Sequence, residues 1–268
     1  MVKKRSNGPK STRALEPSAN TAWVYGIHAV SALLDTHGAN INGVWLLASR
    51  QDARLHALQA RAAELGITCQ TVAPDWFAQH LPPDANHQGV AASYPPPPLL
   101  DEPTLYHLIE QTPSPLVLLL DGVTDPHNLG ACLRTADAAG VSAVVMPKDR
   151  AAGISPTVRK VASGAAESVP CAQVTNLARC LRRLQQAGLW LVGLDGEAEQ
   201  SLFELDLSGP LGLVLGAEGH GLRRLTRTHC DYLAALPMRG RVESLNISVA
   251  TGISLYEALR QRGPNAPG

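Results

Sequence analysis

The sequence predicts an α/β protein in which a small α/β domain precedes a larger domain built on a parallel sheet. In the second half, short apolar runs alternate with segments of helical periodicity. This pattern is typical of parallel strands that helices cover on both faces. In the first half, a shorter series of strand and helix patterns ends at Pro95–Pro98. The length of 268 residues fits one or two domains.

The elements of the first half follow from spacing. Apolar residues recur at helical spacing over 29–34 and 55–65, and Gly66 ends the second of these segments. Strands are expected at 44–47, 67–72 and 90–92, where apolar residues are continuous or alternate. These elements make a domain of about seventy residues.

Four consecutive prolines cannot donate backbone hydrogen bonds and favour an extended chain. We therefore expect a semi-rigid linker with a short helical stretch at 105–109. The expected parts are a disordered basic arm at 1–22, an RNA substrate-binding domain at 23–94, a Pro-rich linker at 95–113, a catalytic domain at 114–263 and a tail at 264–268.

The second half supplies the larger sheet. Its expected strands are 117–120, 143–146, 189–192, 213–215 and 233–236, and its expected helices are 129–139, 156–165, 175–187 and 246–262.

Composition excludes several classes of protein. Lys and Arg equal Asp and Glu at 23 each, so no global field attracts a polyanion, and an aromatic content of 4% argues against an RNA-binding sheet of stacked Phe and Tyr. No apolar run approaches the ~20 residues of a membrane helix. The basic start has no apolar core behind it, so it is not a secretory signal and a cytoplasmic protein is expected.

Five cysteines without a C-x-x-C pair favour neither disulfides nor zinc, and no metal is expected.

Residues 1–13 hold five basic residues and no acid. Such an arm can screen phosphates and steer an RNA partner. The alternative is a solvated tail without function.

Three polar, glycine-containing segments each follow an expected strand, at 120–137, 215–222 and 236–250. Ligands of open α/β sheets bind beyond the carboxyl ends of the strands, so the segments predict one shared pocket. Each also has a structural reading. Asn128 could cap a helix and Arg134 could be an exposed cation, the glycines could make a tight turn, and 244–248 could be capping residues. No P-loop, dinucleotide fingerprint or G-x-S-x-G elbow is present.

At these segments the sequence resembles the SpoU/TrmH class of the knotted SPOUT methyltransferases. Residues 125–136 are similar to the first motif of that family, 213–221 to the second and 244–250 to the third. The resemblance continues at 25–30, 161–170 and 256–262. Over 23–262 the chain is most similar to bacterial members that methylate a guanosine of 23S rRNA.

The resemblance implies transfer of a methyl group from S-adenosyl-L-methionine to a ribose 2'-hydroxyl of 23S rRNA, in the peptidyl-transferase-centre loop. It also implies a deep trefoil knot in the C-terminal domain, an L30e/L7Ae-like fold for the N-terminal domain, and a homodimer. We expect Leu255, Leu259 and the stretch 129–139 to offer apolar dimer surface.

Site residues carry over by motif. The expected methyl-donor pocket consists of Gly216, Leu236 and Leu245, with Leu215, Gly221 and Met238 nearby. The expected catalytic group consists of Arg134, Asn128, Glu218, Ser244 and Asn246. Arg134 is the general base or a phosphate clamp, and the others position the reacting groups.

Other functions stay open at this point. The substrate could be tRNA or another rRNA nucleotide. A catalytically silent RNA-binding factor of ribosome assembly is a second class, which the complete set of motif residues disfavours. The N-terminal domain disfavours a small-molecule methyltransferase.

Overall fold

The computed structural model describes residues 21–50, 52–83, 85–217, 219 and 221–263. The chain divides into two compact units, Met1–Pro96 and Pro97–Gly268. Nearly all of the expected basic arm and the whole expected tail lie outside the described residues.

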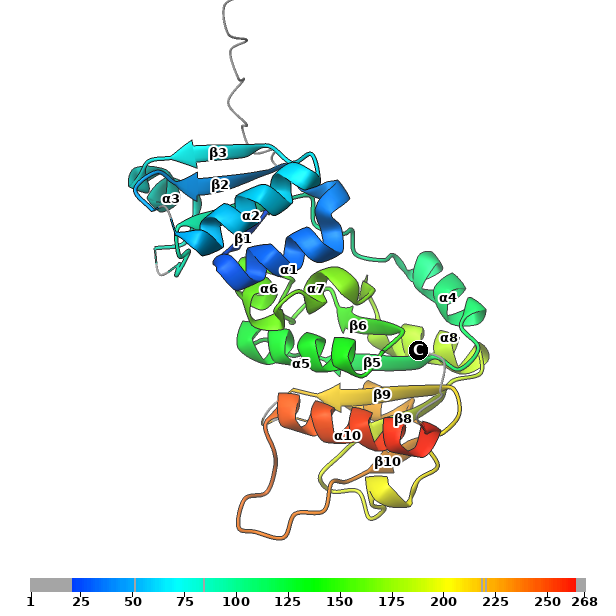
Figure 1. Ribbon diagram of the computed structural model, residues 1–268. Helices are drawn as coiled ribbons and strands as arrows, with labels where there is room; N and C mark the ends of the chain where they lie inside the picture. Colours follow the sequence, from blue (N-terminus) through cyan, green and yellow to red (C-terminus); the bar gives the residue numbers. More distant parts are fainter. Residues whose placement is uncertain (1–20, 51, 84, 218, 220, 264–268) are drawn as a thin grey trace, which may run out of the picture. The chain divides into compact units, whose positions relative to one another are not determined.

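The first unit is a four-stranded sheet of order β1-β4-β2-β3 (Figure 1). Strand β4 is antiparallel to both of its neighbours, and β2 and β3 are parallel. The strands are β1 (Ala22–Tyr25), β2 (Gly43–Leu47), β3 (Cys69–Val72) and β4 (Val90–Tyr94), and the helices are α1 (Ile27–His37), η1 (Gly38–Asn40), α2 (Ala53–Glu64) and α3 (Pro74–His80). Strand β1 and helix α3 were not expected from the sequence.

Two apolar clusters hold this sheet. One contains buried residues of α1 and α2, among them Val30, Leu34 and Leu58. The other lies on the α3 side of the sheet and contains Phe77. Tryptophans from β1, β2 and α3 gather there, with ring centroids 4.9 to 5.4 Å apart. Three of the four tryptophans are therefore used for packing at this place.

The second unit is a six-stranded sheet of order β10-β8-β9-β5-β6-β7. Every pair of neighbouring strands is parallel, as the sequence predicts. The strands are β5 (Leu116–Asp121), β6 (Ala143–Pro147), β7 (Cys171–Val174), β8 (Trp190–Leu194), β9 (Leu211–Gly216) and β10 (Tyr232–Ala234). Strand β7 was not expected, because its four residues include a glutamine and match no long apolar run.

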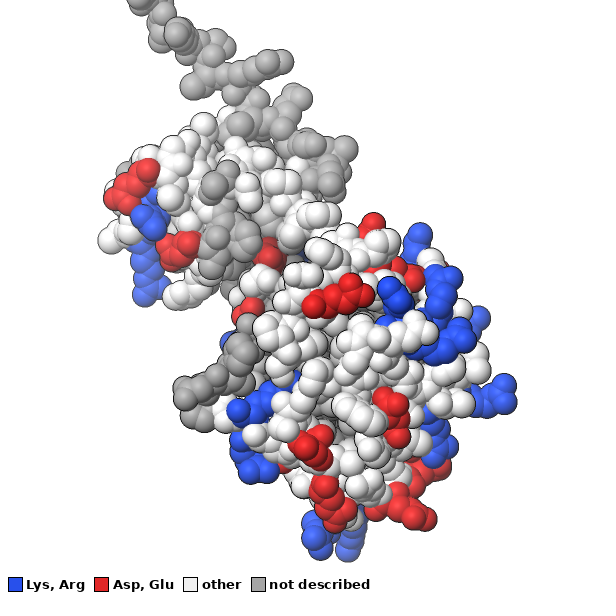
Figure 2. Space-filling view, turned by 90° about the vertical axis from the view of Figure 1, so that its right-hand side faces the viewer, with Lys and Arg blue, Asp and Glu red and all other residues white. Residues whose placement is uncertain are grey.

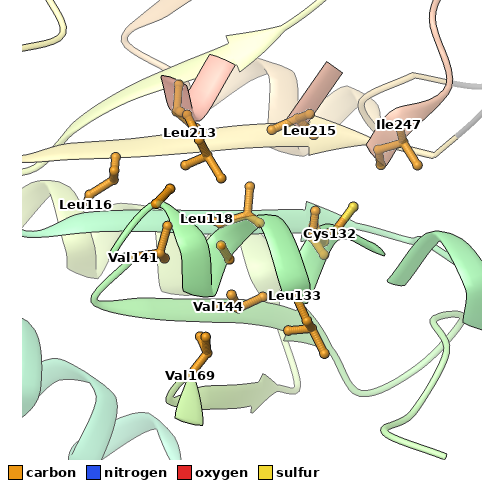
Figure 3. Packing of buried hydrophobic residues seen from close by; sticks show 14 of the residues in the cluster. Leu116, Leu118, Cys132, Leu133, Val141, Val144, Val169, Leu213, Leu215 and Ile247 are labelled. Carbon is orange, nitrogen blue, oxygen red and sulfur yellow. The ribbon is translucent and has the colours of Figure 1, made fainter. Parts of the chain in front are cut away.

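Helices pack on both faces of this sheet, so its strands are apolar on both sides. On β5, Leu116, Leu118 and Leu120 belong to one cluster, whereas Val117 and Leu119 belong to the other. Figure 3 shows the first cluster. The helices of the unit are α4 (Glu102–Gln111), α5 (Pro126–Ala138), α6 (Pro156–Ala162), α7 (Ala165–Ser168), α8 (Leu177–Gln186), η2 (Leu202–Glu204), α9 (Arg224–Thr228) and α10 (Ile247–Arg262).

The range 95–113, expected as a linker, contains a helix of the second core. Leu105 and Ile109 of α4 are buried in the same cluster as Leu181 of α8. The helix is fixed at its start by Asp101, whose side chain accepts a hydrogen bond from Thr104 N. Its apolar stripe packs on the unit, so these residues do not behave as a spacer.

Part of the expected dimer surface is wrong. Leu255 is 0% exposed, and Leu129 and Leu133 are equally buried, because they face the core between α5, α10 and the sheet. The large apolar residues that α10 does expose are Val249 and Tyr256.

The cysteines are free, and Cys132, Cys171 and Cys180 are buried. Burial raises the pKa of the Cys171 and Cys180 thiols to about 12, so they are packing groups, as the sequence suggests. Among the described residues, no group of three or more His, Cys, Asp and Glu is placed to hold a metal ion. In the same part of the chain, no helix has the length and apolar character needed to cross a bilayer.

Candidate active site

Three neighbouring strands, β8, β9 and β10, end at one cavity of about 490 Å³. The cavity is lined by residues that follow each of these strands. It contains all six residues expected in the methyl-donor pocket: Leu215, Gly216, Gly221, Leu236, Met238 and Leu245. The structure therefore brings together the segments 215–221 and 236–245, which are separated in sequence by residues 222–235.

Gly216 allows the chain after β9 to fold back against the strand end. A Cβ atom at this position would lie 2.0 Å from the carbonyl carbon of Gly221. Gly221 has φ +60° and its N–H donates to the carbonyl of Ala217. The backbone of this turn thus forms one wall of the cavity, and only glycine fits at 216.

A second cavity, of about 640 Å³, lies at the ends of β5 and β9. Its lining includes residues 121–125 of the polar segment 120–137 together with Asn128. Ala217, Gly221 and Ile247 line both cavities. Ile247 also packs in the core next to β9, where it is seen near Leu215 (Figure 3). The single pocket expected from the sequence is therefore a pair of adjoining cavities.

The two cavities differ in charge. Of the described residues, the first cavity is lined by Asp195, Glu197 and Glu243 and by no Lys or Arg. The second is lined by three arginines and two aspartates. An acidic lining suits a cationic ligand, and a basic lining suits an anionic one.

A hydrogen bond joins the first and third motifs. Asn246 Nδ2 donates to Asn128 Oδ1 at 2.9 Å. Asn246 is also the N-cap of α10, where its Oδ1 accepts from Ser248 N. The alternative that Asn128 caps α5 is wrong, because Asp125 is the N-cap and accepts from the N–H groups of His127 and Asn128. This leaves the amide oxygen of Asn128 available to Asn246.

The remaining expected catalytic residues are placed as follows. Ser244 is exposed and lines the first cavity. Arg134 is exposed on α5 and lines neither cavity. Its side chain makes no hydrogen bond or ion pair with the described residues, whereas its backbone is part of α5. Glu218 lies outside the described residues. One chain therefore joins Asn128 to Asn246 and places Ser244 at the first cavity, but leaves Arg134 outside both cavities.

The segment 195–197, which follows β8 and lines the first cavity, was not expected from the sequence. Asp195 in it pairs with Arg227 at 2.7 Å. The signal was present, because this Asp-Gly-Glu stretch follows an apolar strand as the three chosen segments do.

The chain is similar to known proteins over most of its length. The SpoU rRNA Methylase family model matches residues 115–256, and the model for RNA 2'-O ribose methyltransferase substrate binding matches 23–100. A 23S rRNA (guanosine-2'-O-)-methyltransferase RlmB from Pseudomonas putida is 54% identical, over 89% of this chain and 96% of its own. The Yersinia pestis protein of the same name is 50% identical, over 91% and 98%.

Among solved structures, the SpoU methyltransferase AviRb from Streptomyces viridochromogenes in complex with AdoMet superposes with a TM-score of 0.73. It has 27% identity and covers 91% of each chain.

Proposed function

Because the chain belongs to the SpoU rRNA methylase family, we propose that it transfers a methyl group from S-adenosyl-L-methionine to the ribose 2'-hydroxyl of a guanosine in 23S rRNA. The observation that carries this is the near full-length identity of 50 to 54% to curated enzymes of that activity. We place the target in the peptidyl-transferase-centre loop and the enzyme in the cytoplasm, where ribosomal RNA is found.

The first cavity fits the methyl donor. S-Adenosylmethionine supplies a methyl group already activated by its positive sulfur. Leu215, Leu236 and Leu245 offer apolar walls for the adenine, and the turn Gly216–Gly221 offers backbone groups at close approach. The acidic lining favours the donor's net positive charge.

A ribose hydroxyl is a poor nucleophile, so the protein has to align it with the methyl group and help to remove its proton. Asn128 lines the second cavity and accepts a hydrogen bond from Asn246, so this pair is suited to fixing the ribose. Ser244 precedes Asn246 by two residues and lines the donor cavity. Because Glu218 belongs to the second motif, we assign it to the residues that position the reacting groups.

Arg134 carries the remaining role, either as the base or as a clamp on the substrate phosphate. Because it lines neither cavity of its own chain, we propose that it acts in the site of a second copy within a homodimer. Helices α5 and α10 pack together, and α10 exposes Val249 and Tyr256. An apolar face on this helix pair suits an interface between copies.

The double variant Val249→Glu, Tyr256→Glu should therefore be monomeric in sedimentation at micromolar concentration and should lose activity, while wild type sediments as a dimer. Phe203→Glu is the matched control, since Phe203 is 48% exposed but lies on η2. A dimeric double variant would show that α10 is not the interface. A monomeric wild type would remove the homodimer.

We further propose that the segments around the donor cavity form a deep trefoil knot and that the first unit has an L30e/L7Ae-like fold. In support of the knot, the chain leaves β10 at the sheet edge and returns past β8 and β9 to α10, which packs on α5. A crystal structure in which the C-terminal segment does not pass through a loop of the chain would refute the knot.

Gly216→Ala is expected to weaken binding of S-adenosylmethionine at least about tenfold, because the added methyl group meets backbone atoms that cannot move aside independently. Isothermal titration calorimetry measures this directly. Gly196→Ala is the control, because a Cβ at Gly196 would meet nothing within 4 Å although the residue lines the same cavity. Equal losses in both variants would contradict the proposed role of the turn.

The function is tested by mapping 2'-O-methyl groups in total RNA from a strain that lacks the gene. We expect one guanosine mark to disappear from 23S rRNA and to return on complementation. Loss of a mark from tRNA instead would assign the chain to the alternative substrate. Unchanged marks throughout would favour a silent assembly factor.

A further inference from the structure

Arg223 is held at the end of the sheet by a buried carboxylate. Asp121, the last residue of β5, has a side chain that is 0% exposed. Its Oδ2 accepts a hydrogen bond from Arg223 N at 2.9 Å, and its Oδ1 lies 3.4 Å from Arg223 Nη1. A buried carboxylate needs a cationic partner, so this pair fixes the backbone of Arg223 and keeps its guanidinium close to Asp121.

Gly122 gives the guanidinium room to lie against the chain. This residue has φ +85°, and a Cβ on it would be 2.9 Å from Arg223 Nη2. The same nitrogen lies 3.5 Å from the carbonyl oxygen of Arg150. Arg150 itself has φ +56°, an uncommon conformation for a residue with a side chain, and such conformations concentrate at functional sites.

The guanidinium keeps donors for a ligand. Its contacts at 3.4 and 3.5 Å are long for hydrogen bonds, and Asp121 Oδ1 has no hydrogen-bond partner. The Arg223 side chain is 44% exposed and lines the second cavity. A planar guanidinium has five N–H donors, so it can pair with a carboxylate at one edge and a phosphate at another.

The other charges of the cavity leave it basic. Arg150 and Arg224 line it, and their side chains have no hydrogen bond or ion pair with the described residues. Of its two acids, Asp121 is paired with Arg223 and Asp125 caps α5. The excess of positive charge belongs to this cavity and not to the whole protein. The chain carries no net charge, and both signs of charge occur on the face of the second unit seen in Figure 2.

We propose that Arg223, together with Arg150, binds a backbone phosphate of the rRNA substrate in this cavity. Asp121 and Gly122 are positioning residues that hold the guanidinium of Arg223 where it can bind the phosphate. The inference rests on the proposed function, because the cavity adjoins the donor cavity along Ala217, Gly221 and Ile247. A phosphate bound here would place its nucleotide chain beside the methyl donor.

The test compares full-length Arg223→Ala, Arg223→Lys and Arg150→Ala in methylation of 23S rRNA from the deletion strain, at several salt concentrations. Arg223→Ala should raise KM for RNA about tenfold, leave kcat and donor affinity nearly unchanged, and lower the slope of log KM against log salt by about one. Arg223→Lys should keep the slope but only part of the affinity, because lysine lacks the planar fork.

Two further variants make the outcome decisive. Arg150→Ala removes no described side-chain contact, so it should stay folded and still raise KM. Arg182→Ala, at an exposed position on α8, should match wild type. If both cavity variants keep the KM and salt slope of wild type, the phosphate site is refuted. Failure of wild type to methylate any RNA would instead refute the proposed function.

Discussion

Replacing Arg134 by alanine is expected to abolish methyl transfer while leaving the affinity for S-adenosylmethionine unchanged. Arg134 is exposed on α5 and does not line the donor cavity, so its loss removes nothing that holds the donor. Whether it takes the proton or grips the phosphate, the transition state depends on it, and kcat should fall by about three orders of magnitude or more. Single-turnover kinetics with 23S rRNA and donor titration by calorimetry measure the two effects separately.

Arg134→Lys tests whether Arg134 acts through the planar shape of its guanidinium or only through its positive charge. Lysine keeps the charge but lacks the planar fork that grips a phosphate in two places, so this variant should also be severely impaired. Near-normal turnover by the lysine variant would show that the specific role is wrong. In a mixed dimer, one chain carries Arg134→Ala and the other carries a substitution in its donor cavity. Partial activity of this dimer would mean that Arg134 acts in the active site of the other copy.

Removing residues 1–96 is expected to leave a folded, dimeric protein that binds S-adenosylmethionine but has lost most of its affinity for rRNA. The second unit has its own core on both faces of the six-stranded sheet and contains both cavities. The removed part contains residues 23–96 of the segment 23–100 that matches the substrate-binding family model and the five basic residues of 1–13. Binding of an rRNA fragment at two salt concentrations gives the size and the salt dependence of the loss.

Deletion of residues 1–20 alone is the control for the basic arm. It should remove a salt-sensitive part of the affinity, because arm–phosphate contacts release counterions, and should leave the recognition by the folded unit in place. Equal rRNA affinity of the 97–268 chain and the full chain would show that the first unit does not read the substrate.

Much of the second unit could be predicted because its strands are continuous apolar runs. Buried parallel strands such as β5 and β9 leave that signature, and the parallel order followed from the helices between them. Strand β7 and helix α3 are too short to show a period. Helix α4 was placed in a linker because four prolines precede it, and its burial depends on the distant helix α8.

Site residues could be predicted where a motif or the local backbone requires a particular residue type. They could not be predicted where two residues far apart in sequence contact each other in the fold. Gly216 and the leucines of the donor cavity followed from motif positions. Asn128 was open to reading as a cap, because its partner Asn246 lies 118 residues away. The Asp121–Arg223 pair spans 102 residues, and no spacing in the sequence indicates it.

The central claim is that this chain makes 2'-O-methylguanosine in 23S rRNA. The most direct measurement incubates the purified protein with S-adenosylmethionine and 23S rRNA from the deletion strain, then digests the RNA to nucleosides for mass spectrometry. One 2'-O-methylguanosine per molecule is expected, with none from the Arg134→Ala protein. Methyl groups found only on bases, or none with wild-type protein and unmodified rRNA, would contradict the claim.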